Sequence, residues 1–286
     1  MPELPEVEII RQYLDEQLPG RTIACADILL TRQLKYPEPE AFQSLVAGKR
    51  MKGMRRRGKY LLLDLQPGST IFFHLRITCS LVYDPSGNQR DAYARMVFHL
   101  AGGGALVFAD VRTFGCVYGF AAGEEIAVSG LQSLGPEPLS EAFTPAYLAQ
   151  AIRGRKQPIK SFLLDQRRIA GLGNIYADES LFLAGIHPRR EAGSLTQAEC
   201  KKLAAAIQHV LRDGLADGGT TFRNYRNGEG GYGRHQEHLC VYHRAGKPCP
   251  TCGRPIEKIT VGGRGTHYCP HCKGSIRLSG IFIRGF

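Results

Sequence analysis

The first residues of the chain, Met1-Pro2-Glu3-Leu4-Pro5-Glu6-Val7-Glu8, place a proline beside a carboxylic acid. Once Met1 is removed, Pro2 carries a free secondary amine. An N-terminal amine has a pKa of roughly 7.7–8.0, so part of it is neutral and nucleophilic at pH 7. Its attack on a sugar carbon leads to an iminium (Schiff base), which activates neighbouring carbons for elimination. Taken alone, the octet is more typical of an ordinary helix start, because early prolines and glutamates suit a first turn.

Four cysteines form two C-x-x-C pairs, Cys249-x-x-Cys252 and Cys269-x-x-Cys272. Two thiolates from each pair complete a tetrahedral Zn²⁺ site and leave no open position for a substrate. The spacing therefore predicts one structural zinc ion, not a catalytic one. The other cysteines are scattered, as is typical of small buried hydrophobic residues.

Between the two cysteine pairs, the strand-like runs 259–261 and 266–268 flank Gly262-Gly263-Arg264-Gly265. We expect a hairpin with Arg264 at a rigid, glycine-lined tip. A guanidinium held in this way is well shaped to bind a phosphate. A solvated turn arginine fits the same pattern.

Further basic and aromatic residues lie beside expected strands. The basic run 50–59 leads into a strand at 60–65, and such runs are usually solvated or bind phosphate without specificity. Lys59 differs because the strand edge fixes its direction. Arg112 and Phe114 follow a strand and point the same way, so together they can enter a duplex. A buried core position fits Phe114 equally well.

A tight turn, Gly171-Leu172-Gly173-Asn174, opens a helix. The N–H groups at such a helix start suit a phosphate. Basic residues just upstream strengthen this interpretation: Arg153, Arg155, Lys156 and Lys160.

The elements that position these residues follow in order. A helix begins after Pro5 and ends at Pro19-Gly20. Short strands separated by Gly and Pro turns predict a β-sandwich or barrel: 60–65, 70–75, 96–100, 105–109 and 116–120. A linker is expected from Gly135. Apolar residues at helical spacing predict helices at 145–152, 159–165, 174–184 and 196–216. The glycine-rich stretch 218–237 is expected to be a mobile loop.

At 286 residues, the chain is long enough for two modest domains with their own cores. It lacks an apolar run long enough to cross a membrane and any signal-peptide pattern, so the cytoplasm is the expected location. The net charge is +11, and nearly all of the excess lies in residues 136–286. That half is the expected polyanion-binding half.

Together these motifs resemble the bacterial formamidopyrimidine-DNA glycosylase family, which is related to endonuclease VIII. The resemblance covers nearly the whole chain. Its motifs are the N-terminal octet, Arg57-Gly58-Lys59-Tyr60, Asp110 to Gly115, Gly173-Asn174-Ile175-Tyr176-Ala177, Ala184-Gly185-Ile186-His187-Pro188, Gly218-Gly219-Thr220-Thr221 and the four-cysteine hairpin.

The resemblance implies an α+β multidomain fold. Residues 1–135 would form a catalytic β-sandwich flanked by helices. A helix–two-turn–helix domain would follow at 136–237 and include a base-covering loop at about 218–237. Residues 238–272 would form the zinc finger and 273–286 a tail, with DNA bound in the cleft between the domains.

The implied activity is excision of oxidised purines from duplex DNA, followed by strand cleavage through β/δ-elimination. By resemblance, Pro2 would attack the sugar C1′, Glu3 would open the sugar ring and Lys59 would serve elimination. Arg264 would grip the lesion-flanking phosphate and assist elimination. The implied DNA contacts are His74, Tyr93, Arg112, Phe114, Arg155, Lys160 and Asn174, besides Arg264.

The chain departs from the family pattern at several positions. The family usually has a methionine where Ile77 stands, and a DNA-contacting histidine where Tyr93 stands. The loop 227–236 and the tail also differ from the usual pattern. These departures bear on lesion preference more than on the catalytic step. Two alternatives stay open: an endonuclease VIII-like enzyme for oxidised pyrimidines, and a non-catalytic zinc-finger protein that binds damaged DNA. The expected partner is damaged double-stranded DNA, bound by a monomer at the bacterial nucleoid, with no membrane.

Overall fold

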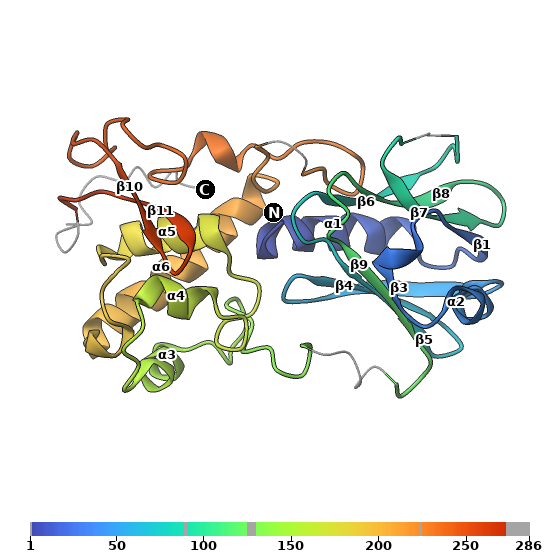
Figure 1. Cartoon of the computed structure of the whole chain (residues 1–286), viewed down its shortest axis with the longest axis horizontal. Coiled ribbons are helices and arrows are strands. Elements are labelled where there is room, and N and C mark those ends of the chain that lie inside the picture. Colours follow the sequence, from blue (N-terminus) through green and yellow to red (C-terminus); the bar gives the residue numbers. More distant parts are fainter. Residues whose placement is uncertain (1, 89–90, 125–129, 223–224, 273–286) are drawn as a thin grey trace. The chain divides into compact units, whose positions relative to one another are not determined.

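The computed structural model describes residues 2–88, 91–124, 130–222 and 225–272, and these form two compact units. The N-terminal unit comprises Met1–Glu137 together with Leu211–His238, and the C-terminal unit comprises Pro138–Val210 with Leu239–Phe286. The predicted 273–286 tail lies outside the described residues. Figure 1 shows the elements of both units in sequence colours.

The N-terminal unit is a β-sandwich, as predicted. Its four-stranded sheet has the order β1 (Ile23–Ile28), β7 (Ala94–Leu100), β8 (Ala105–Asp110) and β6 (Cys79–Asp84). The five-stranded sheet has the order β2 (Leu34–Tyr36), β9 (Cys116–Phe120), β5 (Ser69–His74), β4 (Tyr60–Gln66) and β3 (Arg50–Arg57). Only the β2–β9 pair is parallel among these neighbours. One core of buried side chains joins both sheets.

Two helices pack against this sandwich (Figure 1). Helix α1 (Leu4–Gln17) contacts β3 and β6, the last strand of each sheet. Helix α2 (Pro39–Val46) contacts β1 and β9 toward the other edge. Apolar residues at helical spacing explain the first contact, because Val7, Ile10 and Leu14 are fully buried in the core. A helix over the edge strands β3 and β6 hinders their pairing with another chain.

The basic run before Lys59 is itself strand β3. Its Met51 and Met54 are buried in the core, whereas Arg55 donates to Asp64 of β4 at 2.6 Å. This strand was not predicted, because arginines and lysines mask the inward-facing methionines in the sequence. Strands β1, β2 and β6 and helix α2 were not predicted either.

The C-terminal unit contains the predicted helices and hairpin. Its helices are α3 (Pro145–Ile152), α4 (Ile159–Leu164), α5 (Asn174–Ala184) and most of α6 (Gln197–Ala216), and its strands β10 (Glu257–Val261) and β11 (Arg264–Tyr268) pair antiparallel. Helix α5 contacts both α4 and β11. Most of its residues are buried, so α5 is the central element against which the hairpin packs. Single 3₁₀ turns lie at η1 (Thr31–Gln33), η3 (Ala192–Ser194) and η4 (His235–Glu237).

The glycine-rich stretch differs from the predicted mobile loop of the helical domain. Its described residues belong to the N-terminal unit. The N–H of Thr220 donates to Glu6 Oε1 at 2.8 Å, and the N–H of Tyr83 donates to the carbonyl of Gly228 at 3.2 Å. Tyr225 is buried against the sandwich core. Within the described part of the chain, no helix has the length and apolar character needed to cross a membrane.

Candidate active site and metal centre

Pro2 and Glu3 are both buried at the start of α1. Glu3 is the N-cap, and its N–H donates to Glu6 Oε2 at 2.8 Å in a capping box. The other oxygen of Glu6 accepts the N–H of Thr220. The N-terminal octet can therefore be both an ordinary helix start and a nucleophilic site, since the contacts that begin the helix also fix the backbone beside Pro2.

Lys59 lies in the two-residue turn between β3 and β4 and is only 8% exposed. Glu137 fixes this turn by accepting the N–H of Gly58 at 2.6 Å and Arg56 Nη1 at 2.7 Å. Arg56 also donates to Glu8 of α1 at 2.7 Å. A continuous chain of charged contacts thus connects the Lys59 turn to the helix that begins after Pro2 and Glu3.

His74 ends β5 and is neutral at physiological pH. Burial, followed by the nearby charges of Arg76 and Lys59, lowers the pKa of His74 to about 3. Its Nδ1 accepts the N–H of Arg76 at 3.1 Å. Any contact of His74 with DNA would therefore be a neutral hydrogen bond and not an ion pair with a phosphate.

Asp110 organises the loop that carries Arg112 and Phe114. Its fully buried carboxylate accepts hydrogen bonds from four groups: Gln33 Nε2, Thr78 Oγ1, and the N–H groups of Arg112 and Gly115. Burial alone raises the pKa of Asp110, but its hydrogen bonds, those from Thr78 and Gly115 first among them, together hold that pKa below its ordinary value. The loop is therefore built around a charged carboxylate.

Phe114 is 49% exposed, so its alternative as a core residue is excluded. The guanidinium of Arg112 lies 4.9 Å from the centre of the Phe114 ring. Ile77 and Tyr93, two positions at which the chain departs from the family pattern, are exposed as well. They adjoin the same loop, because Thr78 bonds Asp110 and the N–H of Asp110 donates to the carbonyl of Tyr93. These four exposed side chains, Arg112, Phe114, Ile77 and Tyr93, adjoin the Asp110 loop and are here called the wedge surface.

In the C-terminal unit, Arg264 is exposed and is the first residue of β11, opposite Val261. The turn before it contains Gly262 and Gly263 with φ of 55° and 74°, the left-handed conformation that glycine favours. A side chain at Gly262 would also meet Ser161 Oγ of α4 at 2.5 Å. The absence of a side chain at Gly262 thus allows the turn to lie directly on α4.

Two residues predicted to bind phosphates, Asn174 and Lys160, both bond the hairpin. Asn174 Nδ2 and Lys160 Nζ each donate to the carbonyl of Gly265 at 3.0 Å. The predicted phosphate contact of Lys160 is wrong, because its side chain is fully buried and pairs with Asp178 Oδ1 at 2.6 Å. Asp178 Oδ2 also accepts the N–H of His267. Lys160 therefore braces β11 beside Arg264, whereas Arg155 remains exposed as a phosphate contact requires.

We expect Lys160→Met to destabilise the protein strongly. The substitution leaves the buried Asp178 carboxylate without its cation, a loss that typically costs about 3–5 kcal/mol. Chemical denaturation should show a lower midpoint for unfolding of the C-terminal unit. The double variant Lys160→Met/Asp178→Leu should be more stable than Lys160→Met alone, since it removes both charges. Equal stability of Lys160→Met and the unaltered protein would contradict the bracing role.

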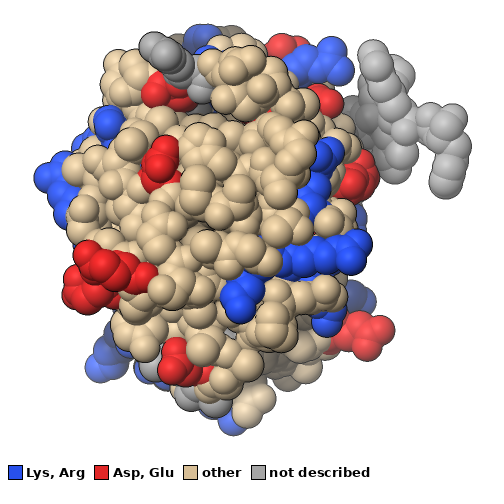
Figure 2. All heavy atoms as spheres, turned by 90° about the vertical axis from the view of Figure 1, so that its right-hand side faces the viewer, with Lys and Arg blue, Asp and Glu red and all other residues tan. Residues whose placement is uncertain are grey.

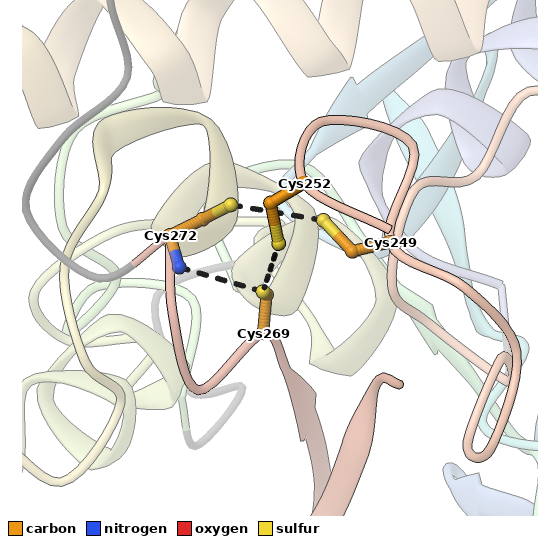
Figure 3. Close-up of side chains that lie close together, drawn as sticks. All are labelled: Cys249, Cys252, Cys269 and Cys272. Carbon is orange, nitrogen blue, oxygen red and sulfur yellow. Dashed lines mark hydrogen bonds between the residues drawn. The ribbon is translucent and has the colours of Figure 1, made fainter. Parts of the chain in front are cut away.

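The four predicted cysteines come together around one point (Figure 3). Cys249 and Cys272 sulfurs lie 3.7 Å apart, and Cys252 and Cys269 sulfurs 3.4 Å apart. Tetrahedral Zn–S bonds of about 2.3 Å require sulfur separations of about 3.8 Å, so the cluster fits zinc with little movement. A backbone hydrogen bond from Arg254 is the main cause that lowers the pKa of Cys252 to about 7, which favours the metal-binding thiolate. The cluster supports one structural zinc ion.

Charge is uneven over the molecule. Figure 2 shows the side bearing β1 and α2, where a largely uncharged centre is flanked by several Lys and Arg side chains along the right-hand edge and by Asp and Glu side chains elsewhere. In the sequence, residues 136–286 carry nearly all of the excess positive charge.

Several residues that position the site had no assigned role in the sequence analysis. Glu6, Asp110 and Glu137 hold the N-terminal residues, the wedge surface and the Lys59 turn. Asp178 holds β11, and buried Glu179 accepts the N–H groups of residues 240, 241 and 242. Glu6 and Asp110 lie within recognised motifs. Glu137, Asp178 and Glu179 do not, and their partners are distant in sequence.

Comparisons with known proteins identify three domain families along the chain. Residues 1–117 match the formamidopyrimidine-DNA glycosylase N-terminal domain, and residues 134–225 match the formamidopyrimidine-DNA glycosylase H2TH domain. Residues 246–273 match the zinc finger found in FPG and IleRS. The last match agrees with the cysteine cluster and its single zinc ion.

Similar proteins share these features over nearly their full length. Formamidopyrimidine-DNA glycosylase of Symbiobacterium thermophilum is 48% identical over 96% of this chain and 89% of its own, and that of Moorella thermoacetica is 48% identical over 91% and 94%. The crystal structure of the MutM (Fpg) protein from Thermus thermophilus is 38% identical, with a TM-score of 0.87, over 96% of this chain and all of that one. A Lactococcus lactis Fpg mutant in complex with Fapy-dG-containing DNA is 34% identical, with a TM-score of 0.89 and the same coverage. The chain therefore belongs to the formamidopyrimidine-DNA glycosylase family.

Proposed function

We propose that this protein is a bifunctional DNA glycosylase and lyase that excises oxidised purines, namely 8-oxoguanine and formamidopyrimidines, from duplex DNA. The observation that carries the proposal is the buried Pro2-Glu3 start, fixed by Glu6 in a chain of this family. Lactococcus lactis Fpg structures with Fapy-dG or abasic-site DNA give the substrate class for relatives. The proposed partner is therefore damaged double-stranded DNA.

In the proposed reaction, the Pro2 amine attacks C1′ of the flipped nucleotide, and the bond from C1′ to the base breaks. Glu3 donates a proton to the ring oxygen, so that the sugar opens and the Pro2 nitrogen and C1′ form an iminium. The iminium acidifies C2′, and loss of that proton expels the 3′ phosphate in β-elimination. A second elimination expels the 5′ phosphate.

The remaining residues of the proposed site stabilise charge during the eliminations and hold the DNA backbone in position. Lys59 serves the eliminations as proton donor or phosphate partner, and its burial makes its charge more effective there. Arg264 binds the phosphate beside the lesion and assists the later elimination. Arg155 and Asn174 contribute further contacts to the DNA backbone, and His74 contributes a neutral one.

The wedge surface is proposed to replace the extruded base. Flipping a nucleotide costs a few kcal/mol of unstacking and unpairing. Phe114 and Ile77 offer apolar surface to the exposed stack, and Arg112 and Tyr93 offer polar groups to the unpaired partner base. The zinc ion supplies no chemistry to the reaction when bound; its four cysteines hold the base of the hairpin that carries Arg264.

The proposed organisation follows the domain scheme expected from the sequence, with catalysis at 1–135, DNA binding at 136–237 and the zinc finger at 238–272. The base-covering role of 218–237 is kept, although the described residues of this segment pack with the N-terminal unit. We further propose action as a monomer in the bacterial cytoplasm, at the nucleoid where the substrate lies.

A panel of lesion duplexes tests the lesion class. We expect rapid cleavage of DNA containing 8-oxoguanine opposite cytosine and at least about tenfold slower cleavage of thymine glycol DNA. Product gels under single-turnover conditions measure both rates. Faster cleavage of thymine glycol would favour the endonuclease VIII-like alternative. Tight binding of every duplex without product would favour the non-catalytic DNA-binding alternative.

A further inference from the structure

Three metal-ligating side chains other than the four cysteines converge in the N-terminal unit. Asp217 follows α6, and His235 and His238 begin and follow the 3₁₀ turn η4. Both imidazole Nδ1 atoms lie close to the same carboxylate oxygen, at 2.8 Å for His235 and 2.6 Å for His238. All three ligand atoms lie within 4.8 Å of one another. We propose that they form a second metal site, for a divalent transition-metal cation of the Zn²⁺ class.

The local backbone explains why the two histidines converge. A 3₁₀ helix has three residues per turn, so residues i and i+3 lie directly above one another. His235 and His238 have this spacing across η4. Their rings therefore face the same side of the turn without help from a distant element.

Main-chain contacts bring Asp217 to the histidines independently of any metal. The N–H of Arg234 donates to the carbonyl of Asp217, and the N–H of His235 donates to that of Gly219, each at 3.0 Å. The two chain segments also touch so closely that a side chain at Gly233 would collide with the Gly219 carbonyl. The three ligands are thus held together by backbone and not only by their own hydrogen bonds.

The donor set and spacing select the class of cation. Two imidazoles and one carboxylate suit Zn²⁺ and its neighbours, whereas Ca²⁺ and Mg²⁺ prefer oxygen ligands. Metal bonds of about 2.0–2.2 Å place adjacent octahedral donors about 2.9 Å apart and tetrahedral donors about 3.3 Å apart. The distances from the Asp217 carboxylate oxygen to the two Nδ1 atoms, 2.8 and 2.6 Å, differ from the octahedral separation by only a few tenths of an ångström.

Exposure leaves one side of the site open to solvent. The side chain of His235 is 6% exposed, that of Asp217 24% and that of His238 61%. Water can therefore complete the coordination sphere, and the cation can enter from the His238 side. Binding requires each imidazole to carry its proton on Nε2, because Nδ1 must offer its lone pair to the metal.

Zinc binding to the full-length protein, with its four-cysteine site already loaded, tests the proposal. Calorimetric titration with Zn²⁺ should detect binding of one equivalent of Zn²⁺ per chain beyond the ion held by the four cysteines. Binding of that equivalent should weaken at least about tenfold in His238→Ala and in Asp217→Asn. His238 is largely exposed, so its removal leaves the fold intact. The matched control is His99→Ala, which removes an exposed histidine from a similar pair with Asp27 at 2.8 Å but with no second histidine. It should bind the further equivalent normally.

Two results would overturn the site. One is saturation of the unaltered protein at a single zinc per chain, measured by metal analysis after gel filtration. The other is binding of a second Zn²⁺ with the same affinity in His238→Ala as in the unaltered protein. Neither measurement involves DNA, so failure of the metal site and failure of the proposed enzymatic function are separate outcomes.

Discussion

A glutamate inserted between Met1 and Pro2 is expected to abolish base excision and covalent trapping. The insertion converts the Pro2 nitrogen into an amide, which has no lone pair available to attack C1′. Loss of a nucleophile costs at least about 10³-fold in rate. Borohydride trapping on 8-oxoguanine duplexes and single-turnover excision measure the effect. Pro2→Gly should retain part of the activity, because its primary amine forms an imine that must be protonated before it activates C2′.

The control for this experiment is DNA binding. Affinity for a duplex with a stable abasic-site analogue should change by less than about threefold in both variants, since Glu3, Glu6 and the wedge surface are unaltered. Mass spectrometry of the unaltered protein should show that Met1 is absent. Excision by the insertion variant at the normal rate would exclude Pro2 as the nucleophile.

The parts of the site that the sequence predicted are those set by local spacing. Two C-x-x-C pairs predict a four-sulfur cluster wherever the turns lie, and the sulfurs are within 4.8 Å of one another. The Gly262-Gly263 turn and the start of α5 at Asn174 are also local features, and both occur where expected. Helix propensity and turn chemistry depend on a few neighbouring residues, so they can be predicted from a single sequence.

The parts that were missed depend on partners distant in sequence. Lys160 has the same appearance as its exposed basic neighbours, and only the fold brings Asp178 and β11 around its ammonium. Asp110 collects donors from residues 33, 78, 112 and 115, which no single motif contains. Such residues establish the geometry, whereas the motif residues carry the chemistry.

Removal of zinc is the second change for which we expect a large effect. An isolated two-stranded hairpin is marginally stable in water, so β10 and β11 depend on contacts at both ends. Lys160 and Asn174 bond the end near Arg264, and the cysteine cluster closes the other end. Zinc binding to such clusters contributes directly to folding. Chelation, or Cys269→Ser, should therefore weaken binding to lesion duplexes at least about 100-fold by releasing the arginine tip.

Two variants separate loss of the hairpin from loss of its arginine. Arg264→Ala should keep its zinc, lose about 1–3 kcal/mol of binding free energy and reduce the salt dependence of binding by about one phosphate contact. Cys25→Ser, at an exposed cysteine outside the cluster, should keep both zinc and affinity. Fluorescence anisotropy over a range of salt concentrations measures all of these effects. Because Arg264 acts only through the hairpin, zinc removal must cost at least as much affinity as Arg264→Ala, and a smaller loss would contradict the structural role of the metal.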